Sequence, residues 1–487
     1  EKAVSLDPTF AVAYLYLGKV AGAIYDTKIQ TEAYETANKY AEKASEKERL
    51  HIEAGYASVV ERSPEKRLRL LLELAEKYPK EKEFHTELGL YYQSRNQFAE
   101  AIAAYDKALA LDADFGPALN QAGYAHAEIG DFERAIRNFE RYAAANPGQA
   151  NPIDSIAELY FRQGKFDQAK AKYQEALEIR PDFFQSCLGL AYISALEENY
   201  AETGHCLEDS IARAPTPMEK MAAAWLKAYY DYFLGRWDES LAEYLTMKDQ
   251  AEKSGATTAL AATNRILGYL YTDRGEYDSA RRAFQAFSDW GMKQDPSKHA
   301  FYSGWNSYAL SWADLKQRRL DAAQARLREI EPLLPKLESD TQEELTRRYW
   351  LSEAEVLLAK DLPEKAIEAG KKIVPENFPS MNVSSMPQYN IPFLKDILAR
   401  AYWKKGDLEQ AIAEYGRLMT IDPNIQARYL IHPLYHYRLG RVYEEKGEKA
   451  KAAAEYGKFL ECWKEADASH PELADARKRL GSLQSPG

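Results

Sequence analysis

Small and large apolar residues recur along this chain with a period of 34 residues. Windows that start at residues 82, 116, 150 and 184 share the pattern. Position 8 holds Gly89, Gly123, Ala157 and Ala191; position 20 holds Ala101, Ala135, Ala169 and Thr203; position 24 holds Tyr105, Phe139, Tyr173 and Leu207; position 32 holds Ala113, Pro147, Pro181 and Pro215. Small residues let two helices approach closely, large residues fill the space beside them, and Pro ends a helix. Each window therefore predicts two packed helices.

A glycine-centred turn separates the two predicted helices, as in the fragments Gly164–Ala169 and Gly406–Ala411. Glycine closes a helix readily because it adopts the left-handed conformation. The pattern resembles the tetratricopeptide repeat family over nearly the whole chain. This resemblance implies an all-α fold, a right-handed α-solenoid (superhelix) of about 12 helix-turn-helix repeats with a C-terminal capping helix.

The register predicts how the chain is organised. We expect the end of a truncated repeat at 1–10, degenerate repeats at 11–80, four regular repeats at 82–217, partly irregular repeats at 218–378, two repeats at 392–466 and the capping helix at 471–482. A long turn or insertion is expected near 26–31. Residues 374–392 contain four prolines and are predicted to form an irregular loop. That loop is either functional or a plain connection between repeats.

Composition narrows the function. The net charge of −11 over 487 residues disfavours nucleic-acid binding, because neutralising phosphates needs a basic face. No apolar stretch approaches the roughly 18 residues of a spanning helix, so membrane insertion is not expected. Three isolated cysteines form no disulfide framework and favour the cytoplasm. Because the chain is expected to open inside a repeat, a leader could be missing upstream, and a periplasmic location stays open.

No catalytic motif is present, and we expect no enzyme activity, no cofactor and no metal. His432 and His436 have the i, i+4 spacing of two metal ligands on one helix face. Pro433 between them favours packing roles instead. Cys187 and Cys206 fall on the two helices of one repeat, where packing thiols are expected rather than a redox pair.

The family resemblance implies a concave groove lined by positions 2, 5, 9, 12 and 13 of each first helix, where a peptide or protein segment binds. Tyr, Trp and Arg are the residue types that anchor interfaces. The alternative for each residue is packing against the neighbouring repeat. The predicted groove residues are Asn120, Tyr124, Asp154, Glu158, Phe161, Arg162, Tyr192, Arg265, Tyr269, Arg400, Trp403, Tyr437 and Arg441. Asn is absent from position 9 of the well-registered repeats, which disfavours the family's clamp for chaperone C-termini.

The C-terminal part, with Ile391–Asp396 and Leu430–Leu439, resembles the repeat arrays of bacterial multidomain signalling proteins linked to a kinase, winged-helix or cyclase-like domain. Three functions follow as hypotheses. The first is a non-enzymatic scaffold that binds a protein or peptide. The second is the sensory or regulatory arm of a larger signalling protein. The third is a structural solenoid that assembles with copies of itself as a homo-oligomer.

Overall fold

The computed structural model describes residues 2–23, 27–376, 389–421 and 429–484. These residues form helices and no strand. The chain divides into two compact units: unit 1 consists of residues 1–161 and 178–180, and unit 2 of residues 162–177 and 181–487. None of the described helices is both long enough and apolar enough to cross a membrane.

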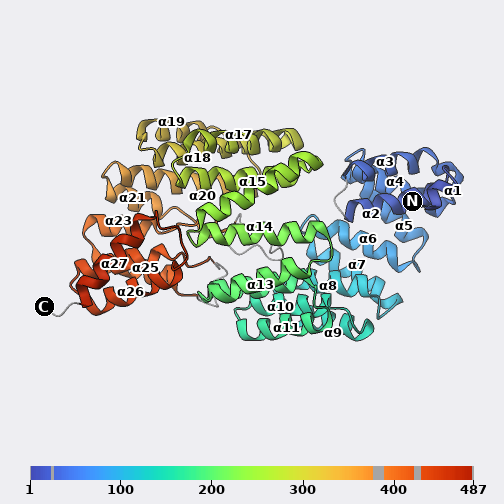
Figure 1. The fold of residues 1–487 in the computed structure, drawn as a ribbon. Helices are drawn as coiled ribbons and strands as arrows, with labels where there is room; N and C mark the ends of the chain where they lie inside the picture. The colour runs from blue at the N-terminus through green and yellow to red at the C-terminus, as the bar shows by residue number, and fades with distance from the viewer. Residues whose placement is uncertain (1, 24–26, 377–388, 422–428, 485–487) are drawn as a thin grey trace. The chain divides into compact units, whose positions relative to one another are not determined.

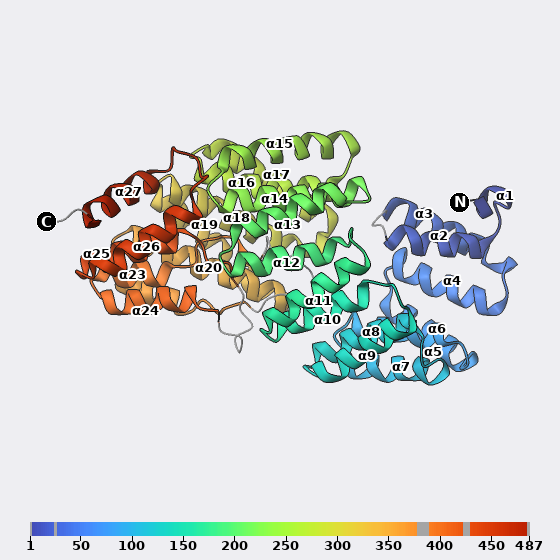
Figure 2. The same cartoon turned by 60° about the horizontal axis from the view of Figure 1, so that its bottom comes forward.

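Unit 1 is built from consecutive helix pairs, which can be followed in blue and cyan in Figures 1 and 2. Its elements are α1 (Lys2–Leu6), α2 (Ala11–Ala23), α3 (Thr27–Lys39), η1 (Ala41–Lys43), α4 (Glu46–Val59), α5 (Pro64–Lys77), α6 (Lys82–Gln93), α7 (Phe98–Leu111), α8 (Gly116–Glu128), α9 (Phe132–Ala145) and α10 (Asn151–Arg162). From α1 to α9 each helix packs on the next, as α6 does on α7 and α7 on α8.

Unit 2 continues the same helix-turn-helix succession. Its elements are α11 (Phe166–Ile179), α12 (Phe184–Leu196), α13 (Tyr200–Arg213), α14 (Pro217–Phe233), α15 (Trp237–Ser254), α16 (Thr257–Asp273), α17 (Tyr277–Gln294), η2 (Pro296–Lys298), α18 (His299–Lys316), α19 (Leu320–Ile330), η3 (Leu334–Lys336), α20 (Ser339–Ala359), α21 (Pro363–Gly370), α23 (Ile397–Lys405), α24 (Leu408–Met419), α25 (Leu434–Glu445), α26 (Lys449–Cys462) and α27 (Pro471–Gln484). The all-α prediction and the pairing of helices are confirmed.

The small residue at position 8 and the large residue at position 24 meet inside a pair. A Cβ atom added to Gly123 would lie 2.7 Å from Cζ of Phe139, and one added to Gly89 would collide with Cε1 of Tyr105. Both rings are fully buried. The first helix therefore passes directly over an aromatic ring of the second, and a larger residue at position 8 would force the two helices apart.

The long turn or insertion expected near 26–31 is wrong. Helix α3 begins at Thr27, and the ring of Tyr34 lies 2.9 Å from the point where a Cβ atom of Gly18 would stand. Gly18 and Tyr34 are sixteen residues apart, the same spacing as Gly89 and Tyr105. The first pair thus keeps the repeat register without an insertion.

Most of the irregular loop predicted at 374–392 lies outside the described residues, at 377–388. At its far end, Tyr389 and Asn390 are buried. The Tyr389 ring stacks on Tyr429 with 4.4 Å between ring centroids. This end of the segment is therefore part of the core of unit 2.

Candidate functional site

Asn120 and Tyr124, two predicted groove residues on α8, connect neighbouring repeats of unit 1. Asn120 Oδ1 accepts a hydrogen bond from Nδ2 of Asn151 at 3.2 Å, and the hydroxyls of Tyr124 and Ser155 lie 2.7 Å apart. Burial raises the pKa of Tyr124. Both side chains are half-buried, so part of each still faces outward. These contacts agree with the alternative in which a groove residue packs against the neighbouring repeat.

Three further first-helix residues of unit 1, which the sequence reasoning missed, form an ion cluster. Lys19 Nζ of α2 lies 2.6 Å from Glu87 Oε1 of α6, and His51 Nε2 of α4 lies 2.9 Å from the same oxygen. Burial alone would raise the pKa of Glu87, but the contacts with His51 and Lys19 outweigh it and lower the pKa to about 2. In the window that begins at Ala11, Lys19 stands at position 9, which is one of the positions expected to face the groove. The repeat pattern could therefore have predicted Lys19 as a groove residue.

In the C-terminal repeats, the predicted residues Trp403, Tyr437 and Arg441 come together with Asp475 of α27. The Arg441 guanidinium lies over the Trp403 ring at 5.6 Å from its centroid and donates to the Tyr437 hydroxyl at 3.3 Å. Tyr437 donates to Asp475 Oδ2 at 2.8 Å. The three predicted residues are half-buried. Together with Asp475 they form a row of side chains across α23, α25 and α27 that is partly accessible to solvent.

Arg400 is also half-buried, and its guanidinium forms ion pairs with two carboxylates. Its Nε lies 2.9 Å from Oδ1 of the fully buried Asp396, and its NH1 lies 3.1 Å from Oε2 of Glu355. The acids on both sides hold the pKa of this guanidinium above its usual value, although burial alone would lower it. Glu158 and Arg162 are half-buried as well.

Five of the predicted groove residues are buried, although the family resemblance places their side chains on the surface of the groove. Asp154, Phe161, Tyr192, Arg265 and Tyr269 are all less than 9% exposed. The Tyr192 hydroxyl accepts from Nδ2 of Asn390, which lies 198 residues further along the chain. The partner-binding role of the groove residues stays a prediction.

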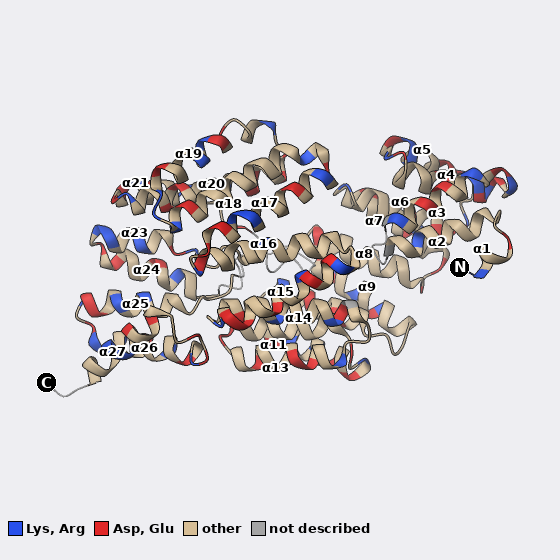
Figure 3. Cartoon of the chain, turned by 45° about the horizontal axis from the view of Figure 1, so that its top comes forward, with Lys and Arg blue, Asp and Glu red and all other residues tan. Residues whose placement is uncertain are grey.

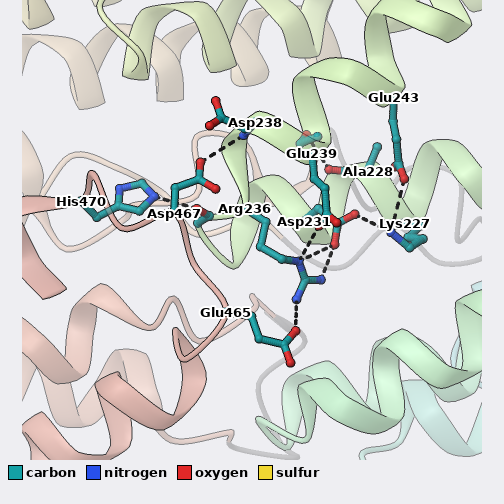
Figure 4. Close-up of polar contacts among 12 residues, drawn as sticks. Lys227, Ala228, Asp231, Arg236, Asp238, Glu239, Glu243, Glu465, Asp467 and His470 are labelled. Carbon is teal, nitrogen blue, oxygen red and sulfur yellow. Dashed lines mark hydrogen bonds and ion pairs between the residues drawn. The ribbon is translucent and has the colours of Figure 1, made fainter.

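In unit 2 the C-terminal residues also contact the turns of the middle repeats, and Figure 4 shows these contacts at the α14–α15 turn. We call this set of contacts, between the α12–α13 and α14–α15 turns and residues 430–470, the seam. The amide of Asp467 donates to the carbonyl of Gly235 at 3.0 Å, and Nε2 of His470 lies 2.7 Å from the same oxygen. Oδ2 of Asp467 accepts from the amide of Asp238 at 3.0 Å.

An ion cluster lies beside these backbone contacts. Asp231, fully buried, pairs with Lys227 at 2.8 Å and with Arg236. Arg236 in turn reaches Glu465, with NH1 3.3 Å from Oε2 (Figure 4). A buried carboxylate needs such partners, because an unpaired charge away from water is costly. The seam therefore combines backbone hydrogen bonds with a chain of ion pairs.

Phe393, which follows the irregular segment, lies among the aromatic rings of α14. Its ring centroid lies 5.0 Å from those of Tyr229 and Tyr232 and 5.1 Å from that of Phe233. Edge-to-face packing of this kind adds to the apolar burial of the rings. The chain's own residues thus cover part of the surface that the sequence assigned to a partner.

A cavity of about 710 Å³ remains between the first helices of unit 2 and the seam. Its aromatic lining comes from Tyr232, Trp237, Tyr269, Trp312, Phe393 and Trp463. Its charged lining includes Asp273, which accepts from the Tyr232 hydroxyl at 2.5 Å and lies 3.1 Å from Lys316 Nζ. Glu472 of α27 also lines the cavity. Pockets of this size and mixed lining suit a ligand of several residues or a small molecule.

Three of the candidate metal and redox residues, His432, Cys187 and Cys206, are buried or half-buried. In the part of the chain that the structure describes, His, Cys, Asp and Glu form no group that could hold a metal. His432 is buried, and burial lowers its pKa to about 3. Cys187 and Cys206 are free thiols, and burial raises their pKa values to about 11 and about 12. Thiols in such surroundings are poor nucleophiles.

The charges of the described helices are mixed. In the view of Figure 3, Lys and Arg are interspersed with Asp and Glu along the helices. A continuous basic stripe, as needed to follow a phosphate backbone, is not seen on the described residues in this view.

Known proteins match parts of the chain. One tetratricopeptide repeat model matches residues 82–115 and 154–183, and a second matches residues 396–425. Superkiller complex protein 3 of Homo sapiens is 26% identical over 102 residues, 21% of this chain and 6% of that protein. Anaphase-promoting complex subunit 3 of Schizosaccharomyces pombe is 25% identical over 103 residues, 21% of this chain and 16% of that protein.

A shorter relative is the photosystem I assembly protein Ycf3 of Rippkaea orientalis, 30% identical over 91 residues, 18% of this chain and 53% of that protein. The chain thus spans about half or less of each of these relatives. Among solved structures, a thermophilic TPR protein of Thermus thermophilus aligns with a TM-score of 0.32 and 19% identity, covering 40% of this chain and 98% of that one. MamA of Desulfovibrio magneticus RS-1 aligns with a TM-score of 0.31 and 17% identity, covering 35% and 96%.

The sequence matches fall on the helix pairs α6 with α7 and α23 with α24, and on the helices α10 and α11. Within each unit other consecutive helices pack in the same way, such as α8 with α9 in unit 1 and α12 with α13 in unit 2. The chain therefore contains tetratricopeptide repeats at residues 82–115, 154–183 and 396–425, and its similar proteins and helix pairs support this family.

Proposed function

We propose that this chain is a non-enzymatic scaffold that binds a peptide or protein segment, and that the cavity of unit 2 is one place where it does so. Tetratricopeptide repeat proteins are in general protein-interaction scaffolds and typically not enzymes. The observation that carries the proposal is the cavity of about 710 Å³ lined by aromatic side chains of α14, α16 and α18. These are first helices of their pairs, whose inner faces the sequence assigns to partner binding.

The lining suits a segment with both apolar and charged side chains. Trp and Tyr supply large contact areas at a low entropic cost, and they are enriched at binding hot spots. Carboxylates and cations alternate around them, with Asp273 and Glu472 on one hand and Lys316 and Arg438 on the other. Such a mixture favours a peptide over a purely apolar ligand such as a lipid chain.

A blocking substitution tests the site. Ser469 is an exposed residue of the α26–α27 turn and lines the cavity, whereas its exposed neighbour Ala468 does not line it. Peptides selected from a random display library on the full chain are measured by calorimetry against S469W and A468W. We expect S469W to weaken binding at least about tenfold, since an indole would occupy the space of the ligand. A468W should bind like the unmodified chain.

Helicity and the melting temperature must stay unchanged in both variants for this comparison to hold. If peptides bind S469W and A468W equally well, or if the chain selects no peptide, the cavity is not the binding site. The half-buried row of Trp403, Tyr437 and Arg441 would then be the next surface to substitute.

The other two hypotheses remain proposals. A self-assembling array would cover apolar side chains that are exposed on α1 and α2 of unit 1, where Leu6 is 78%, Tyr16 is 59% and Val20 is 58% exposed. Light scattering at several protein concentrations measures this directly. The regulatory-arm hypothesis, like a cytoplasmic location, depends on what the full coding sequence contains.

A further inference from the structure

His436 lies in the seam with a carboxylate on each side of its ring. It belongs to α25 and its side chain is 1% exposed. Its Nε2 lies 2.5 Å from Oε1 of Glu198 in the α12–α13 turn, and its Nδ1 lies 2.6 Å from Oε2 of Glu455 in α26. Glu198 and His436 are 238 residues apart in the chain. One imidazole therefore joins the middle and C-terminal repeats of unit 2.

Both contacts need a proton on the ring nitrogen. An ionised carboxylate only accepts hydrogen bonds, and a neutral imidazole has a single N–H. A neutral His436 would therefore turn a nitrogen lone pair toward one of the two glutamates. Only the imidazolium donates to Glu198 and Glu455 together, and its positive charge also offsets two carboxylates that are mostly withdrawn from water.

Two neighbours of this contact, Tyr200 and Cys462, stay uncharged near neutral pH. The half-buried Tyr200 donates its hydroxyl to the carbonyl of Ile431 at 2.8 Å, and desolvation raises its pKa well above the usual value. Burial raises the pKa of Cys462 on α26 to about 12. Lys458, also on α26, adds a positive charge near Cys462. Neither Tyr200 nor Cys462 thus supplies a change of charge in the neutral range.

We propose that His436 is a proton-dependent latch, whose imidazolium form holds the C-terminal repeats of unit 2 against the α12–α13 turn. This inference goes beyond the proposed function, since it concerns an opening of the fold and needs no ligand. Deprotonation removes one hydrogen bond and leaves two facing carboxylates without their cation, so the contact opens.

The direction of the pH effect follows from the two states of the ring. Burial lowers the pKa of His436, but the hydrogen bonds to Glu198 and Glu455 outweigh it, and the pKa in the closed state is raised. The latch is therefore fully formed below the pKa of about 6.5 of a free histidine, and it is lost as the pH rises through the closed-state pKa. Each pKa unit between the free and the closed-state value changes the equilibrium between the closed and open contact about tenfold.

Hydrogen exchange of the full chain measures this opening. Peptides covering residues 197–203 and 430–437 are followed between about pH 6 and pH 9, with correction for the intrinsic exchange rate. We expect their protection to fall as the pH rises. H436Q should show weak protection that does not change with pH. Protection that is constant in the unmodified chain, or that falls equally in H436Q, would overturn the latch.

Two further variants make the result specific. E198Q leaves an amide that can either donate or accept, so a neutral His436 satisfies it, and protection should persist to the highest pH. H205Q removes an exposed histidine of α13 and should retain the profile of the unmodified chain. A pH dependence that survives in E198Q or disappears in H205Q would assign the effect to another group.

Discussion

At the scale of single residues, Asp396 shows how a charged side chain serves the core of this repeat array. It is fully buried, and its oxygens meet Arg438 at 2.6 Å, Arg400 at 2.9 Å and the Tyr415 hydroxyl at 3.0 Å. Burial alone would raise the pKa of Asp396, but the two guanidinium groups lower it well below its usual range. The carboxylate therefore links α23, α24 and α25 only while it is ionised.

Asp396→Asn should destabilise the protein by about 3–5 kcal/mol, because it leaves two guanidinium groups without their buried partner. The pKa of Asp396 is lowered, so its stabilising effect is present above the unfolded value of about 3.9 and is lost as the pH falls through the folded value. The difference from the unmodified chain should thus be constant between about pH 5 and pH 7 and shrink below about pH 4. Urea unfolding across this range measures it. D340N, at an exposed position of α20, is the control and should change little.

At the scale of helices and turns, the α14–α15 turn has a second role besides ending a helix. Gly235 has φ of +80°, as Gly275 of the α16–α17 turn has φ of +79°. Both conformations favour glycine. A Cβ atom at Gly235 would also lie 2.9 Å from Cβ of Ala466 across the seam, whereas one at Gly275 would meet nothing within 4 Å. The same turn thus serves as a helix end in one repeat and as a docking point in another.

The pair Gly235→Ala and Gly275→Ala separates these two roles. Each variant should lose about 1–2 kcal/mol from the left-handed backbone conformation. Only Gly235→Ala should lose a further ~1–3 kcal/mol, because its methyl group pushes against Ala466. Hydrogen exchange of residues 463–470 should rise in Gly235→Ala alone. Equal unfolding free energies and equal exchange in the two variants would show that the seam contributes nothing to stability.

At the scale of the whole molecule, the two units are expected to respond differently to a local perturbation. Repeats in an array contact mainly their neighbours, so damage stays local. Unit 1 follows this rule in its described contacts, since each helix packs on the next few along the chain. In unit 2 the seam adds contacts between residues that are about 230 positions apart, such as Gly235 and His470.

Gly123→Leu should therefore raise hydrogen exchange in α8 and α9 and leave the seam peptides of unit 2 unchanged. The leucine would collide with the Phe139 ring, at a cost of ~1–3 kcal/mol or more. Gly416→Leu, on an exposed part of α24 with nothing within 4 Å, should cost little. Seam exchange that rises as much as that of α8 and α9 would mean that the units unfold together.

The sequence by itself determined the local structure. The small residue at position 8, the ring at position 24 and the turn glycine lie within sixteen residues of one another, as in Gly123, Phe139 and Gly130. A single 34-residue window therefore contains the whole interaction. The absence of known catalytic motifs was equally visible in the residues. The proposed binding role of exposed Tyr and Arg side chains rested on the family resemblance.

Only the tertiary structure decided which of those side chains are open. Tyr192 is covered by Asn390, and His436 meets Glu198, through contacts that span 198 and 238 residues. A periodic pattern has no signal for such pairs, because their geometry depends on the summed curvature of many repeats and on a segment that breaks the register. The cavity and the latch therefore follow from how unit 2 folds back on itself, which no single repeat encodes.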